Sequence, residues 1–100
     1  MIKEVKYTAR VTGTDSGPIP DAFDRSLNYN IVDLHIPRTK GNNIRLRTYI
    51  DPGYIDPALK PPAKGELVDV TVNTSLGLIY GVKSMETANG RYPVSNFDQI

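Results

Sequence analysis

Basic and aromatic side chains alternate with apolar ones in the segment from Ile44 to Ile50. Arg45, Arg47 and Tyr49 occupy every second position, and side chains at such positions share one face of a β-strand. Cationic side chains follow the phosphates of a single-stranded nucleic acid, while aromatic rings stack on its bases whatever their sequence. The segment is therefore predicted to be a strand whose solvent-exposed face binds a single-stranded nucleic acid.

Other cationic and aromatic residues are expected to extend this surface. Tyr29 lies on the preceding predicted strand, and Tyr54 lies in a Pro-rich connection, where it either stacks on a base or anchors the loop. The predicted nucleic-acid-binding residues are Lys6, Arg10, Tyr29, Arg38, Lys40, Arg45, Arg47, Tyr49 and Tyr54. Asp33 lies among them and weakens the positive charge locally. The alternative is that these Arg and Tyr side chains only form cross-strand pairs on a solvated sheet face.

The sequence contains few residues that could form a catalytic or a metal-binding site. The single histidine, His35, shares a face with Asp33, but there is no cysteine and no serine is placed as a nucleophile, so a loose surface pair is expected. One histidine without cysteines also argues against a zinc site. Asp15, Asp21 and Asp24 lack the spacing of a calcium-binding loop. We therefore expect no enzymatic activity, no metal and no cofactor.

Charge and hydropathy restrict the class of protein further. The net charge of +1 argues against coating of nucleic acid by bulk charge alone. Residues 1–50 carry eight Lys and Arg against five Asp and Glu, so a local basic patch is still expected. No run of about 18 apolar residues predicts a membrane span. The first residues lack the apolar core of a signal peptide, and the absence of cysteine fits a reducing compartment, so a cytoplasmic protein is expected.

Five β-strands are expected to position these residues. Strict alternation of apolar and polar residues predicts half-buried strands at 5–11, 28–36, 44–50, 67–73 and 76–85. Gly77 and Gly81 predict a bulge or a bend in the last strand. Because no helix is convincing, the predicted fold class is all-β, a small five-stranded OB-like barrel.

The predicted barrel domain spans residues 1–86. Residues 87–100 are expected to form a C-terminal tail, unless Tyr92, Val94 and Phe97 pack back onto the sheet. The connections at 13–27 and 51–65 are long and contain proline, and such connections are more often functional or mobile than simple spacers.

Several segments resemble the helix-destabilising, single-stranded-DNA-binding proteins of filamentous phages. The resemblance is one of pattern and extends loosely over residues 1–85. It is carried by Met1-Ile2-Lys3, the segment from Leu27-Asn28 to Val32-Asp33-Leu34, Pro57-Ala58-Leu59, Leu67 to Val72 and Gly77-Leu78 to Val82.

The resemblance implies a five-stranded OB-like barrel that forms a homodimer and coats single-stranded DNA cooperatively during replication. Binding in that family uses exposed Tyr and Arg or Lys, for which Tyr29, Arg45, Arg47 and Tyr49 are the nearest matches by position and type. This chain departs from the family in its acidic, Pro-containing segment 13–27, in its lower net charge and in its longer C-terminal segment.

Two classes of function therefore follow from the sequence. The first is a sequence-tolerant protein that binds single-stranded nucleic acid, with DNA favoured, in phage or plasmid replication. The second is a small phage or accessory module that binds a protein partner through the 13–27 and 51–65 connections; near-neutral charge and long Pro-rich connections fit this class better.

Overall fold

Antiparallel β-strands form all the regular structure of this computed structural model in its described residues, 2–20, 23–37, 41–50 and 60–100. Seven strands make one sheet in the order β6-β5-β4-β1-β2-β3-β7. They are β1 (Lys3–Gly17), β2 (Tyr29–Ile36), β3 (Ile44–Ile50), β4 (Leu67–Ser75), β5 (Leu78–Thr87), β6 (Gly90–Pro93) and β7 (Asn96–Gln99). The predicted all-β fold class is confirmed. The described part of the chain contains no helix long and apolar enough to cross a membrane.

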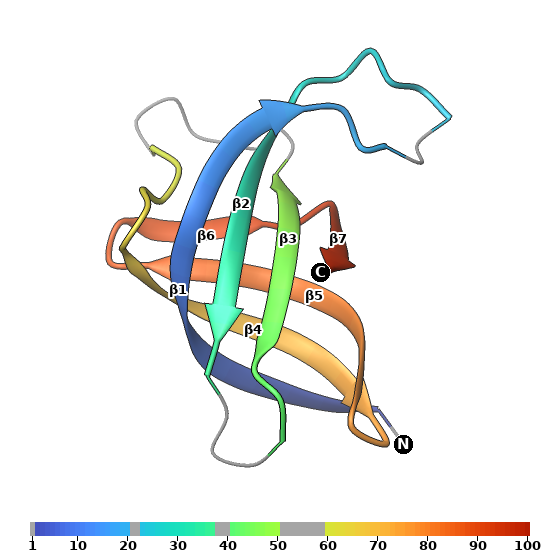
Figure 1. The fold of residues 1–100 in the computed structure, drawn as a ribbon, viewed down its shortest axis with the longest axis vertical. Helices are drawn as coiled ribbons and strands as arrows, with labels where there is room; N and C mark the ends of the chain where they lie inside the picture. Colours follow the sequence, from blue (N-terminus) through green and yellow to red (C-terminus); the bar gives the residue numbers. More distant parts are fainter. Residues whose placement is uncertain (1, 21–22, 38–40, 51–59) are drawn as a thin grey trace.

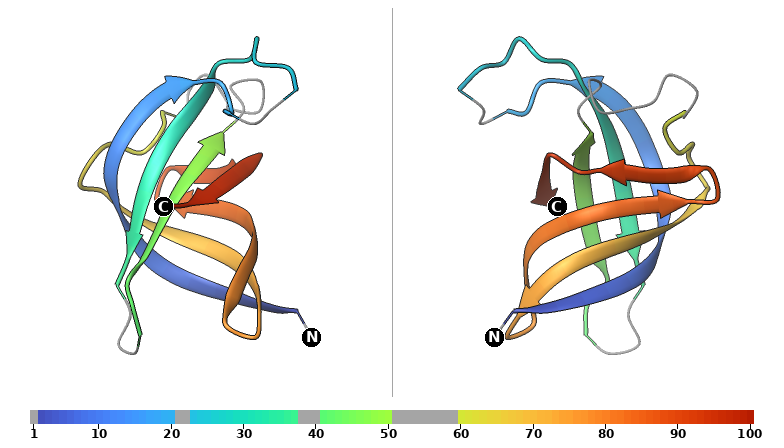
Figure 2. Two further views of the ribbon diagram at one scale, coloured as in Figure 1. Left: turned by 45° about the vertical axis from the view of Figure 1, so that its right-hand side comes forward. Right: turned by 180° about the vertical axis from the view of Figure 1, so that it is seen from behind.

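Strand β1 holds the sheet together because it belongs to both of its halves. Its first part, from Lys3 to Arg10, pairs with β4, and its second part, from Arg10 to Gly17, pairs with β2. The register shifts between Val11 and Gly13, and such a bulge bends a strand and increases its twist. The sheet consequently curls into a half-barrel, in which β1, β2 and β3 cross over β4, β5 and β6 (Figures 1 and 2).

The apolar core fills the space between these two layers. Inward positions on β2 and β4 follow the alternation of the sequence, because every second residue of these strands is apolar and buried. The buried apolar cluster consists of Ala9, Val11, Val32, Leu34, Ile36, Ile44, Leu46, Ile50, Val68, Val70, Val72, Val82, Met85 and Tyr92. The expected irregularity near Gly81 is present as a register shift between β4 and β5, whereas Gly77 lies in the turn before β5.

Residues 87–100, expected as a tail, contain the last residue of β5, the turn after it, and strands β6 and β7. Tyr92 is fully buried and its hydroxyl donates a hydrogen bond to the carbonyl oxygen of Lys60, while Val94 and Phe97 pack against the core. Strand β7 pairs with β3, and β6 pairs with β5. The prediction of five strands was wrong because the two extra strands have four residues each, which is too short for alternation to be recognised.

The burial of Tyr92 generates a first prediction. Replacing Tyr92 with Ala should lower the free energy of unfolding by about 3 kcal/mol or more, because a large side chain leaves a cavity in the core. Replacing its exposed neighbour Arg91 with Ala should change it by no more than about 0.5 kcal/mol. Urea unfolding followed by circular dichroism measures both. Equal effects of the two substitutions would show that β6 does not belong to the folded core.

Candidate nucleic-acid interface

Three cationic or potentially cationic residues lie side by side across the convex face of β1, β2 and β3. Arg10 is the register partner of His35, and His35 is the register partner of Arg45. We call Arg10, His35 and Arg45 the basic row. Neighbouring strands are roughly 4.8 Å apart, so the two arginines stand roughly 10 Å apart at the backbone. Both are exposed, and His35 is half-buried.

The two arginines of the basic row keep their charge available. Arg10 donates one hydrogen bond, from Nη1 to the carbonyl oxygen of Gly65 at 3.1 Å. The ion pairs between described residues are Arg47–Asp33, Lys83–Glu4 and Arg91–Glu86, and neither Arg10 nor Arg45 takes part in them. An anion that approaches the row therefore meets two guanidinium groups that no described carboxylate neutralises.

Arg47, predicted to contact phosphate, is held by an acid instead. Its Nε donates to Oδ1 of Asp33 at 2.8 Å and its Nη2 donates to Oδ2 at 3.2 Å. These hydrogen bonds and the charge of Asp33 raise the pKa of Arg47. Because the two residues are register partners on β2 and β3, this bidentate pair follows from the hairpin. A phosphate has to compete with Asp33 for this guanidinium group.

Tyr49, predicted to be exposed for stacking, is buried. Its hydroxyl donates a 2.8 Å hydrogen bond to Oδ2 of Asp98, and β7 pairs with β3 at this position. The ring of Tyr29 meets it edge-on, with centroids 6.4 Å apart and an interplanar angle of 88°. Burial and the hydrogen bond to Asp98 both raise the pKa of Tyr49. Tyr29 is half-buried, so part of its surface stays open at the end of β2.

Lys6 is the one remaining predicted residue that the structure describes, and it lies outside the basic row. Lys6 is exposed on the same face of β1 as Arg10, but it lies four residues away, about 13 Å along the strand, where β1 pairs with β4. Arg38, Lys40 and Tyr54 lie outside the described residues, so their predicted roles stay predictions.

The structure adds two residues that the sequence analysis did not select. His35 was assigned to Asp33, but that carboxylate bonds Arg47 and leaves His35 in the basic row. Phe23 is fully exposed in the connection between β1 and β2, close to the exposed Arg25. Phe23 could have been selected from the sequence, because it is an aromatic residue within a polar connection. The position of His35 between two arginines could not, because it depends on the register of the paired strands.

A hollow of about 350 Å³ adjoins the basic row and is lined by residues that include Thr12, His35, Arg45 and Ile100. The described residues contain no group of three or more His, Cys, Asp or Glu side chains that would hold a metal ion. No family of known proteins, no curated protein and no solved structure matches the chain. The geometry of this face thus places two exposed guanidinium groups without a described acidic partner beside an open hollow.

The environment of Tyr49 generates a second prediction. Its raised pKa in the folded protein means that, as the pH rises above about 10, the unfolded chain loses this proton first. The free energy of unfolding should therefore fall with rising pH in that range, because the unfolded state binds fewer protons. Tyr49→Phe should make this fall less steep. Urea unfolding of both proteins between pH 8 and about 11 measures it; equal slopes would contradict the burial of the phenol.

Proposed function

We propose that this protein binds single-stranded nucleic acid without sequence preference, as an OB-like half-barrel that uses its convex face. The basic row is the observation that carries the proposal, since it places Arg10 and Arg45 on the two strands that flank β2, with no described acid paired to either. Guanidinium groups bind phosphate oxygens through several hydrogen bonds in a fixed geometry. Their separation of roughly 10 Å suits contact with more than one phosphate of the same strand.

Aromatic contacts at the end of the β1–β2 hairpin complement the charges. Phe23 is fully exposed in the connection, and Tyr29 begins β2 with part of its surface open. Base stacking on such rings is tolerant of sequence because every base has a π-face. Phosphate contacts along the strands and stacking at their end together account for sequence-tolerant binding by a protein whose net charge is only +1.

The small number of cations in the basic row sets the expected strength of the salt dependence. For single-stranded nucleic acids, the logarithm of the association constant falls with the logarithm of salt concentration by about 0.7 per phosphate neutralised. Two or three contacts therefore correspond to a slope between about −1.4 and −2. The resemblance to helix-destabilising proteins of filamentous phages favours DNA as the ligand, a homodimer as the assembly, and the coating of single strands in phage or plasmid replication as the role.

A second candidate function is a protein-interaction module. Leu76 is almost fully exposed at the turn between β4 and β5, and Leu78 and Tyr80 are exposed on β5 just after it. Leu76 has a positive φ of 53°, a conformation that residues other than Gly, Asn and Asp rarely adopt. Exposed contiguous apolar side chains mark interaction surfaces in soluble proteins. This hairpin end lies on the opposite half of the sheet from the basic row.

The third prediction tests the basic row with matched arginine variants. Arg45→Ala should weaken binding of fluorescein-labelled oligothymidine and of a mixed-sequence strand by similar factors, and should reduce the salt slope by about 0.7. Arg45→Lys should preserve the slope because the charge remains. Arg91→Ala, which removes an ion-paired arginine of β6, should change neither the affinity nor the slope. Fluorescence anisotropy at several salt concentrations measures all four proteins.

Two results would overturn the proposal. The first is the absence of salt-dependent binding of oligothymidine by the unmodified protein. The second is an equal effect of Arg45→Ala and Arg91→Ala, which would show that the basic row has no special part in binding.

The fourth prediction separates stacking from charge. Phe23→Ala should weaken binding by about 1–3 kcal/mol if the ring stacks on a base, and it should leave the salt slope unchanged because no charge is removed. Phe23→Tyr should retain most of the affinity. The same anisotropy titrations measure both variants; a Phe23→Ala protein that binds as well as the unmodified one would exclude the ring from the interface.

A further inference from the structure

One edge of β1 is unpaired over several residues. Strand β4 pairs with β1 only from Lys3 to Arg10, and β2 occupies the other side of β1 from Arg10 to Gly17. Val11 still has partners on the β4 side, since its N–H donates to the carbonyl oxygen of Glu66 at 2.9 Å and its carbonyl oxygen accepts from Gly65 N–H at 2.8 Å. Beyond Val11 no described strand pairs with this edge of β1.

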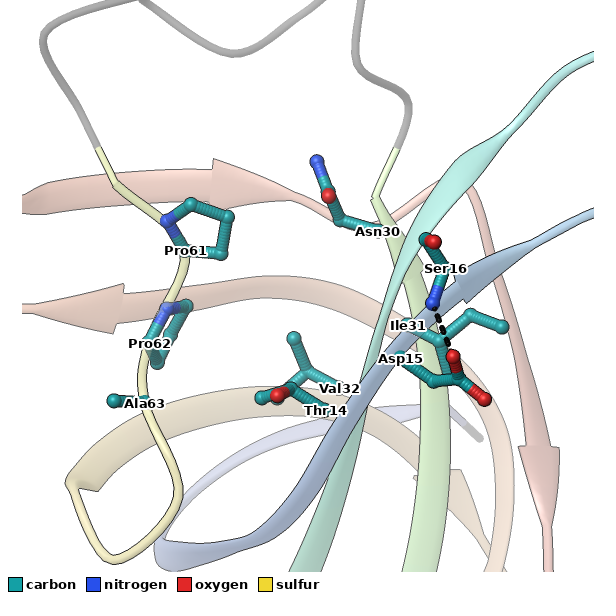
Figure 3. Close-up of a pocket in the computed structure, with 9 residues that line it drawn as sticks. All are labelled: Thr14, Asp15, Ser16, Asn30, Ile31, Val32, Pro61, Pro62 and Ala63. Carbon is teal, nitrogen blue, oxygen red and sulfur yellow. Dashed lines mark hydrogen bonds between the residues drawn. The ribbon is translucent and has the colours of Figure 1, made fainter.

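The chain segment that faces this edge is unable to complete the ladder. It runs through Pro61 and Pro62, and proline has no N–H to donate to a neighbouring strand. Pro62 is buried, and the hydrogen bond from Tyr92 to the Lys60 carbonyl oxygen anchors the start of the segment. A slot of about 400 Å³ therefore separates β1 from residues 61–63 (Figure 3).

Three residues of β1 beyond the bulge, Thr14, Asp15 and Ser16, line this slot. The N–H of Ser16 donates to Oδ1 of its own neighbour Asp15 at 2.8 Å (Figure 3). Alternate residues of a strand direct their N–H and C=O groups to the same edge, so Thr14 offers its backbone groups on the side that Ser16 does. The Asp15 carboxylate thus accepts a backbone hydrogen bond that a neighbouring strand would otherwise accept. Exposed edges of this kind are templates for pairing with another chain.

We infer that this slot binds an extended peptide segment of a partner protein, which adds to the sheet as a strand beside β1. A polypeptide backbone in the extended state presents N–H and C=O groups that match those of Thr14 and Ser16, whereas a nucleic-acid strand has no such repeat. Val32 and Pro62 line the slot as apolar surfaces, which suit an apolar side chain at the centre of the peptide. The slot lies beside Thr14 and Ser16, away from the basic row, so the inference does not depend on nucleic-acid binding.

The test uses an array of acetylated, amidated heptapeptides with Val fixed at the centre and the other positions randomised. The tightest binder is titrated into ¹⁵N-labelled protein. The expected result is that the amide signals of Thr14 and Ser16 shift and that both amides become protected from hydrogen exchange, while the amides of His35 and Arg45 do not move. Two N-methylated versions of the peptide complete the test, because methylation of the amides that face β1 should abolish binding and methylation of the alternate amides should not.

Adjacent substitutions in β1 should act in opposite directions. Ser16→Pro removes the N–H from the open edge, where proline is tolerated, and should weaken peptide binding by about tenfold or more. Asp15→Ala removes the internal acceptor of that N–H and should strengthen peptide binding. Retained oligothymidine binding and an unchanged urea midpoint show that each variant is folded. If Ser16→Pro does not fold, the pair of N-methylated peptides gives the same answer with the unmodified protein.

Several outcomes would overturn the inference. The first is that no heptapeptide binds at millimolar concentration. The second is that the two N-methylated peptides bind equally well. The third is that a folded Ser16→Pro variant binds the peptide with unchanged affinity. Displacement of the peptide by oligothymidine would assign the slot to the nucleic-acid site instead. Failure of oligothymidine binding alone would overturn the proposed function and leave the peptide site standing.

Discussion

The bulge in β1 between Val11 and Gly13 is the feature on which the other parts of the structure depend. It lets one strand of 15 residues pair with β4 along its first part and with β2 along its second. It also reverses which residues face the core, because Val11 is buried before the bulge whereas Thr14 pairs with buried Val32 after it. A straight strand with continuous alternation would give neither the curled sheet nor the open edge opposite Pro61 and Pro62.

Ion pairs and hydrogen bonds with acidic side chains on the convex face determine which of its cations remain without an acidic partner. Asp33 pairs with Arg47, and Asp98 accepts the hydrogen bond of Tyr49. Both acids lie directly across from their partners or beside them in the sheet, where such pairs form with little loss of side-chain freedom. Arg10 and Arg45 of the basic row, like Lys6 farther along β1, form no ion pair with a described carboxylate. A protein of near-neutral charge therefore keeps exposed cations on this face that no described carboxylate neutralises.

Local alternation predicted the parts of the fold that depend on one strand alone. Val32 and Leu34 on β2 and Val70 on β4 are buried as their positions predict, and the fold class follows from such patterns. Tyr49 was placed wrongly because β7, more than forty residues later in the chain, covers it through Asp98. Contacts between distant segments leave no periodic signal in the strand they cover. The basic row depended on cross-strand register, which alternation does not specify.

Gly65 connects the basic row to the slot beside β1. Its carbonyl oxygen accepts the hydrogen bond of Arg10, and its N–H donates to Val11 at the end of the open edge. Gly65 also has a positive φ of 94°, which a residue with a side chain would adopt only with strain. The segment that walls the slot thus also holds one guanidinium group of the convex face. Gly65 therefore contacts both Arg10 of the basic row and Val11 at the end of the open edge of β1.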